Sequence, residues 1–198
     1  MEPQTASQNS QIVFGLNQNM GSRANMEDHI EVRFVQTGGG LDLFVALVAD
    51  GIGGHNCGEV ASELTVQTTF AQIAASPARS PSQIPQMLAE ALTAANDVVY
   101  QESRRDLKKS GMGTTATIAA IHENNLYLAN VGDSRAYLMR DQKLTQLSSD
   151  HTWAREMVHQ GHLSVAEAAA HPKGGALVRS IGYEQQVAVD VGLYINGG

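Results

Sequence analysis

The chain lacks the features by which several classes of protein are recognised. Its 198 residues contain a single cysteine, Cys57, which excludes an intramolecular disulfide and favours a reducing compartment. No apolar run approaches the length of a membrane span, and the opening MEPQTASQNSQ has neither the basic start nor the apolar core of a signal peptide. We therefore expect a cytoplasmic protein that does not use a membrane as a partner.

Basic residues are also scarce. Lys and Arg number 13 against 20 Asp and Glu, so the formal net charge is -7. Nucleic acids and anionic membranes require clustered cations, and we expect neither as a partner. The one basic cluster, residues 104–109, lies near the end of a predicted helix. Cations there oppose the negative end of the helix dipole, so we interpret the cluster as structural.

We expect one domain. An apolar content of 42% is enough for one buried core, and the sequence shows no internal repeat or break in composition. Residues 1–10 are polar and aperiodic, and we expect a disordered tail there, followed by a domain over residues 11–198. Alternating or short continuous apolar runs predict strands at 12–16, 30–35 and 41–49.

Two helices are predicted next, the first over residues 58–75 and the second from the N-cap Ser82 until Gly111. Short turns then indicate an antiparallel meander of four strands, at residues 114–121, 126–131, 135–140 and 143–147.

Two short helices and a strand complete the pattern. Asp150 is a candidate cap for a helix ending at Gly161, and Ser164 with Glu167 forms a capping box for another. The last predicted strand alternates over residues 187–195. Strands, long helices and strands again predict an α+β fold, in which antiparallel sheets are covered by helices.

A carboxylate stands at the end of one apolar strand, where Asp50 opens the glycine-rich stretch DGIGGHNCGE. The negative charge suits a hard divalent cation, and glycine lets backbone carbonyls such as that of Gly51 approach a ligand. A tight loop whose aspartate caps a turn is the alternative interpretation.

Further acids occur at other strand ends. Glu27 and Asp28 lie in SRANMEDH between two predicted strands, and Asp133 follows a strand in NVGDSRAY. Adjacent carboxylates gathered next to Asp50 would repel one another unless a cation neutralised them. Taken singly, each acid is equally explained as a turn residue.

Arg23, in the same SRANMEDH stretch, offers a planar guanidinium that can bind a phosphate with two hydrogen bonds. The alternative is a surface ion pair with Glu27, which would contribute only about 0–1 kcal/mol.

Five ordered segments carry a resemblance to a known family: SRANMEDH, LFVALVADGIGGHNCGEVAS, MGTTATIAAI, LANVGDSRAYLMRDQKLTQLSSDHTW and ALVRSIG. Together they resemble the signature segments of metal-dependent serine/threonine phosphatases of the protein phosphatase 2C type, particularly the compact bacterial ones. The resemblance implies a sandwich of two antiparallel sheets flanked by helices, with a binuclear Mn²⁺ or Mg²⁺ centre at one end and a third, weaker metal in bacterial members.

The resemblance also implies a role for each acid. Asp50 matches the carboxylate that bridges both metals, Gly51 a residue whose carbonyl binds one of them, and Glu27 an acid that reaches a metal directly or through water. Asp28 matches the acid that orients metal-bound waters, and Asp133 a ligand of the third metal. Arg23 falls on the arginine that holds the substrate phosphate.

The mechanism that this implies is direct hydrolysis of phosphoserine and phosphothreonine by a water that two cations acidify. Residues 151–179 resemble the family's flap near the site. Where some members place a histidine after the Asp-Gly pair, Ile52 stands here, so another histidine, a metal-bound water or solvent must protonate the leaving group. His55, His151 and His171 are candidates, although a single histidine is more often a packing residue.

The chain departs from the family after residue 195, where two further metal-binding aspartates of the family pattern have no counterpart. We therefore expect an incomplete C-terminus without the last family strands, and weak or single-metal binding. The alternative function is a non-catalytic phosphoprotein-binding or regulatory domain. A nucleotide site at DGIGG is disfavoured because no Gly-Lys-Ser/Thr follows it. The expected partners are phosphorylated proteins and a cognate serine/threonine kinase pathway, and the expected state is a monomer.

Overall fold

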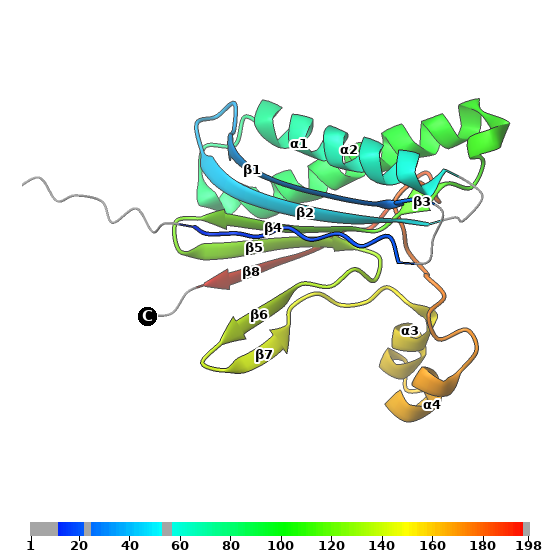
Figure 1. The fold of residues 1–198 in the computed structure, drawn as a ribbon. Coiled ribbons are helices and arrows are strands. Elements are labelled where there is room, and N and C mark those ends of the chain that lie inside the picture. The colour runs from blue at the N-terminus through cyan, green and yellow to red at the C-terminus, as the bar shows by residue number, and fades with distance from the viewer. Residues whose placement is uncertain (1–11, 22–24, 53–56, 196–198) are drawn as a thin grey trace, which may run out of the picture.

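The computed structural model describes residues 12–21, 25–52 and 57–195 (Figure 1). The predicted tail at residues 1–10 lies outside these ranges. Among the helices in the described ranges, none combines the length and apolarity that crossing a bilayer would need.

A single antiparallel sheet forms the centre of the fold, with the strand order β1-β2-β4-β5-β8 and with β3 pairing to the end of β2. Short turns link β1 to β2 and β4 to β5, as antiparallel pairing allows, whereas the other neighbouring strands are joined by long connections. The strands of this sheet are β1 Asp28–Gln36, β2 Asp42–Ile52, β3 Gly113–Thr114, β4 Ala116–His122, β5 Asn125–Val131 and β8 Asp190–Ile195.

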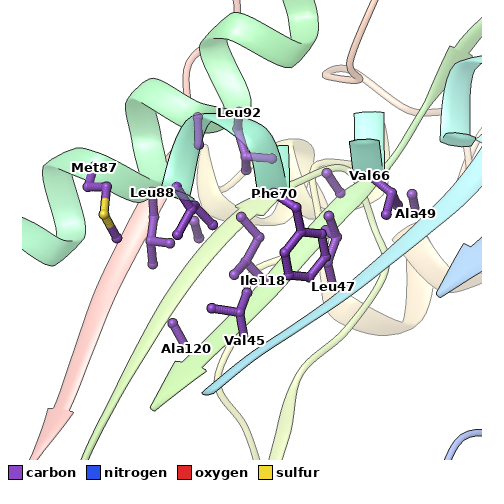
Figure 2. Close-up of a cluster of buried hydrophobic side chains, with 14 of the residues drawn as sticks. Val45, Leu47, Ala49, Val66, Phe70, Met87, Leu88, Leu92, Ile118 and Ala120 are labelled. Carbon is purple, nitrogen blue, oxygen red and sulfur yellow. The ribbon is translucent and has the colours of Figure 1, made fainter. Parts of the chain in front are cut away.

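Two long helices, α1 Gly58–Ala75 and α2 Ile84–Arg105, cover one face of the sheet (Figure 1). Alternate residues of β2 face them and are fully buried, and the side chains of Phe70 and Leu92 fill the space between helices and sheet (Figure 2). Burying each large apolar side chain of this kind contributes about 1.5–3 kcal/mol, so this layer is the main source of stability. The helix-facing residues of β2 are Val45, Leu47 and Ala49.

The opposite face, called the open face below, carries no long helix among the described residues. Residues 12–20 form no strand, so the strand predicted at 12–16 is wrong. The ring of Phe14 instead packs on the ring of Phe44 of β2, with 5.5 Å between the ring centroids. Phe44 is next to the helix-facing Val45 and therefore belongs to the open face. The apolar side chains of this stretch, such as Val13 and Leu16, are exposed, because an alternating pattern produces a half-buried strand only where a neighbouring strand is available to pair.

The predicted four-stranded meander is also corrected. β6 Tyr137–Arg140 and β7 Lys143–Gln146 pair only with each other in the described part of the chain, as a second, two-stranded sheet. The chain leaves the main sheet after β5 because Gly132 adopts a φ of 102°, which turns the backbone away. The fold is thus α+β with antiparallel sheets and helices.

The helix boundaries test the capping predictions. The bounds of α1 and the capping box of Ser164 and Glu167 before α4 Val165–Ala170 are confirmed. Ser80, not Ser82, caps the short 3₁₀ turn η1 Pro81–Gln83 that precedes α2. Thr152, not Asp150, caps α3 Trp153–His159, because the Asp150 carboxylate is bound to Arg135.

The remaining elements agree in outline with the sequence patterns. The alternating strand predicted at 187–195 is shorter as β8 and pairs with β5. The basic cluster begins in the last turn of α2 and continues into η2 Leu107–Lys109, where Lys109 bonds Glu102. This agrees with its structural interpretation.

Candidate metal centre

The ends of β1 and β2 bring two of the predicted acids together. Asp28 and Asp50 stand directly opposite each other in the antiparallel register. Side chains in such a pair share a face, with β-carbons about 4.5–5.5 Å apart, and like charges there repel. The shared face is the open one, because Ala49, the neighbour of Asp50, faces the helices. Two carboxylates at this separation fit a divalent cation, which would remove the repulsion.

Glu27 and Gly51 meet at the same sheet end. The N–H of Gly51 donates to the Glu27 carbonyl at 3.1 Å, and the Ser62 hydroxyl of α1 donates to that carbonyl at 2.6 Å. A β-carbon on Gly51 would lie 2.4 Å from the Gly58 carbonyl oxygen and 2.6 Å from that of Glu27. Only glycine therefore allows β1, β2 and the start of α1 to converge here.

Asp133 lies in the turn after β5, and a buried threonine joins this turn to Asp50. The hydroxyl oxygen of Thr115 accepts from the N–H of Asp50 at 3.0 Å and lies 2.7 Å from the Ser134 hydroxyl. The N–H of Thr115 donates to the Asp50 carbonyl at 2.9 Å. One residue that is 1% exposed thus fixes the backbone of Asp50 relative to the turn that carries Asp133.

A second threonine places that turn over the open face. Thr117 lies between the helix-facing residues Ala116 and Ile118, and its hydroxyl donates to the Ser134 carbonyl at 2.8 Å. The turn of Asp133 is therefore on the face onto which Asp28 and Asp50 open.

The side chains are less closely gathered than the strand ends. Among residues 12–21, 25–52 and 57–195, no group of three or more His, Cys, Asp or Glu side chains could hold a metal ion. Asp28 lines a pocket of about 370 Å³ with Glu59 and Glu63 of α1. Asp133 lines another, of about 340 Å³, with flap residues such as Arg155. The fold therefore brings the backbones of the predicted ligands together. Their side chains do not form a cluster of three carboxylates among the described residues.

Two of the predicted residues lie outside the described ranges, namely Arg23 and the candidate proton donor His55. Of the other two histidines, His171 stacks at 4.2 Å between ring centroids on Trp153. His151 is buried, and both of its ring nitrogens lie within hydrogen-bond distance of polar groups. These contacts favour packing roles for both.

Sequence reasoning missed the polar residues that support the site. Thr115 and Ser134 stand inside the motifs GMGTTATI and VGDSRAY, but nothing local indicates that their hydroxyls meet. It also missed the ion pair of Arg135 and Asp150 at the rim of the Asp133 pocket. The hydrogen bond to Asp150 is the main cause that raises the pKa of Arg135 above its ordinary value.

Comparison with known proteins decides the family. The family model of protein phosphatase 2C matches residues 12–157. The chain belongs to this family. Protein phosphatase 2C enzymes are metal-dependent, and the oxygen donors of Glu27, Asp28 and Asp50 are of the type that Mn²⁺ and Mg²⁺ prefer.

Individual relatives support the assignment. A serine/threonine phosphatase of Listeria monocytogenes is 38% identical over 149 residues, which cover 74% of this chain and 58% of the relative. A putative protein phosphatase 2C-type protein of Streptococcus pyogenes is 34% identical over 173 residues, 87% of this chain and 68% of the relative. The chain thus spans well under two thirds of the length of the Listeria protein.

Solved structures show the same fold. The serine/threonine phosphatase of Staphylococcus aureus superposes with a TM-score of 0.79 at 28% identity, covering 88% of this chain and 67% of that one. The S. agalactiae serine/threonine phosphatase gives a TM-score of 0.78 at 32% identity, over 87% of this chain and 69% of that one.

Proposed function

We propose that the protein is a metal-dependent phosphatase that hydrolyses phosphoserine and phosphothreonine in proteins. The observation that carries the proposal is the pairing of Asp28 with Asp50 across two strand ends, on the face over which the Asp133 turn folds. Membership of the protein phosphatase 2C family supports it. Phosphorylated proteins and a kinase pathway that produces them are the corresponding partners.

Each residue has a proposed part in the reaction. Glu27, Asp50, the Gly51 carbonyl and Asp133 would hold divalent cations, which would supply acidification of water and a positive charge against the phosphate. Asp28 accepts hydrogen bonds from the attacking water and orients it. The Asp50 backbone keeps its position because Thr115 bonds both its N–H and its carbonyl.

Arg23 binds the phosphate oxygens, for which its guanidinium is geometrically suited. Water attacks phosphorus directly, so no phosphoenzyme forms.

The proposal includes a domain over residues 11–198 that is one part of an α-β-β-α sandwich, with residues 151–179 as the flap. The open face of the main sheet is where a second sheet packs in such a sandwich. Hydrophobic side chains exposed on this face, such as Val48, fit that arrangement.

A second candidate function is a phosphoprotein-binding or regulatory domain without catalysis. It is favoured because the described residues contain no group of three carboxylates that could hold a metal ion. It would keep the phosphate-binding arginine but would not respond to Mn²⁺.

Activity measurements separate the two. We expect Mn²⁺-dependent hydrolysis of p-nitrophenyl phosphate and of a phosphoserine peptide, weak in the 198-residue chain and stronger when the chain is extended by about fifty residues. Asp50→Ala should lower the rate of the extended chain about a hundredfold or more, because a ligand shared by the metals is lost. Asp97→Ala, at an exposed position of α2, is the matched control and should leave the rate unchanged. Full activity in Asp50→Ala would refute the assignment.

Calorimetric titration of the 198-residue chain with Mn²⁺ tests the metal site directly. Because the described residues gather fewer than three carboxylates, we expect one weak site. Two tight sites would contradict the site as it is proposed.

A further inference from the structure

One buried histidine joins the flap to the turn that carries Asp133. His151 is 6% exposed, and its Nδ1 accepts a hydrogen bond of 3.0 Å from the N–H of Gly132. Its own backbone N–H donates to the Gly132 carbonyl, also at 3.0 Å. His151, the first residue of the flap, therefore hydrogen-bonds both the N–H and the carbonyl of Gly132, the residue before Asp133.

The geometry determines which ring nitrogen carries the proton. The N–H of Gly132 can only donate, so Nδ1 of His151 must be the accepting nitrogen. In the neutral ring Nε2 then carries the hydrogen and donates to the Asp190 carboxylate at 3.0 Å. Arg179, at the far end of the flap, donates to the other oxygen of Asp190 at 2.6 Å.

The two ends of the flap are thereby held to the main sheet at one point. The N–H of Val178 donates to the His151 carbonyl at 2.9 Å, and Thr152 forms an isolated β-bridge with Leu177. Asp190 belongs to β8, next to β5 in the sheet. The imidazole of His151 thus lies between the base of the flap, strand β8 and the Asp133 turn.

We propose that His151 is a positioning residue that couples the base of the flap to the turn of Asp133, so that flap position and cation affinity at Asp133 influence each other. The inference rests on the proposed function, because it takes Asp133 as a metal ligand. Coupling of this kind is reciprocal: a cation that orders the turn also orders the flap, by the same factor.

Two observations make the turn suited to transmit such a change. Gly132 has a φ of 102°, and a β-carbon there would lie 2.6 Å from Cγ2 of Thr115, so the turn has little room to adjust. Its N–H is buried, and removing the acceptor would leave a donor unsatisfied. The pocket of about 340 Å³ is lined by Asp133 together with Arg155 and His171 of the flap. A ligand there would contact both coupled parts.

Two substitutions separate the two bonds of the ring. In His151→Asn the amide reaches the position of Nδ1 and can still accept from Gly132, but it loses Asp190. In His151→Gln the amide reaches the position of Nε2 and keeps Asp190, but it leaves Gly132 without an acceptor. Thermal unfolding followed by circular dichroism establishes that each variant is folded.

The readouts are the affinity for Mn²⁺, from the electron paramagnetic resonance signal of free Mn²⁺, and amide hydrogen exchange in α3 and α4 with and without Mn²⁺. Mn²⁺ should slow flap exchange in the unmodified chain. His151→Gln should bind Mn²⁺ about tenfold more weakly, as loss of an outer partner of a metal site does. His151→Asn should bind within about twofold of the unmodified chain but lose the flap response.

A second variant and a control keep the test decisive if the histidine variants do not fold. Arg179→Ala removes the donor to Asp190, whose Nη1 also lies 3.1 Å from Nε2 of His151, and should reproduce the loss of flap response. Lys173→Ala removes an exposed flap cation that forms no ion pair with the described residues, and it should behave as the unmodified chain.

The outcomes distinguish the inference from the function on which it rests. If Asp133→Asn weakens Mn²⁺ binding while His151→Gln, His151→Asn and Arg179→Ala change neither readout, the coupling is refuted and the metal site stands. If Asp133→Asn leaves Mn²⁺ affinity unchanged, the proposed role of Asp133 fails and the coupling with it.

Discussion

Replacing Thr115 by valine tests whether its hydroxyl holds the candidate site together. Valine has nearly the shape of threonine but no hydroxyl, so the change removes the bonds to the Asp50 N–H and the Ser134 hydroxyl and leaves the packing in place. Leaving a buried donor unsatisfied costs about 1–3 kcal/mol. We expect the free energy of unfolding to fall by about that amount, and the melting temperature by about 2–4 °C for each kcal/mol in a chain of this size.

The chain supplies a matched control for this substitution. Thr69 of α1 is 0% exposed, and its hydroxyl has no hydrogen-bond partner among the described residues. Thr69→Val therefore removes a hydroxyl that is buried without a hydrogen bond to the described residues. The substitution should leave the free energy of unfolding unchanged or raise it. The same chemical change is thus expected to destabilise the protein at Thr115 but not at Thr69, although the two positions are equally buried.

Urea unfolding followed by circular dichroism measures both variants. The midpoint of Thr115→Val should fall and that of Thr69→Val should stay or rise, with the slope m unchanged in both. Equal shifts in the two variants would show that the Thr115 hydroxyl has no special role and would refute the argument that it positions Asp50.

Two further predictions concern the sheet end and the flap base. Gly51→Ala should lower the free energy of unfolding by several kcal/mol, because the new methyl group would lie 2.4 Å from a backbone oxygen. Gly175→Ala is the control and should be tolerated, because open space surrounds that position. Equal melting temperatures of the two variants would contradict this prediction. Asp190→Asn should destabilise the protein at pH 6 but progressively less as the pH falls below about 4, and a destabilisation that is constant down to pH 2 would contradict it.

The sign of the second effect follows from the surroundings of Asp190. Partial burial alone would raise the pKa of this carboxyl, but the hydrogen bonds from His151 and Arg179 outweigh it and lower the pKa below its ordinary value of 3.8. A carboxyl with a lowered pKa stabilises the folded state above the ordinary value, and this contribution is lost as the pH falls through the folded-state pKa. The asparagine variant lacks the contribution at every pH.

Local patterns predicted much of the secondary structure because the forces involved act over a few residues. The bounds of α1 follow from its flanking residues, and the capping box before α4 is formed by two side chains three positions apart. Predictions failed where a distant partner decided the outcome. Asp150 has the chemistry of a helix cap, but the guanidinium of Arg135, fifteen residues earlier, binds it instead.

The sequence alone determined the family, the order of most elements and the acids that are candidates for metal binding, because motif spacing and side-chain chemistry are properties of the chain itself. Only the tertiary structure decided that Asp28 stands opposite Asp50, that Thr115 links Asp50 to the Asp133 turn, and that His151 joins this turn to the flap. These contacts join residues between 19 and 65 positions apart, and they form only when strand register and the turn at Gly132 bring those residues together.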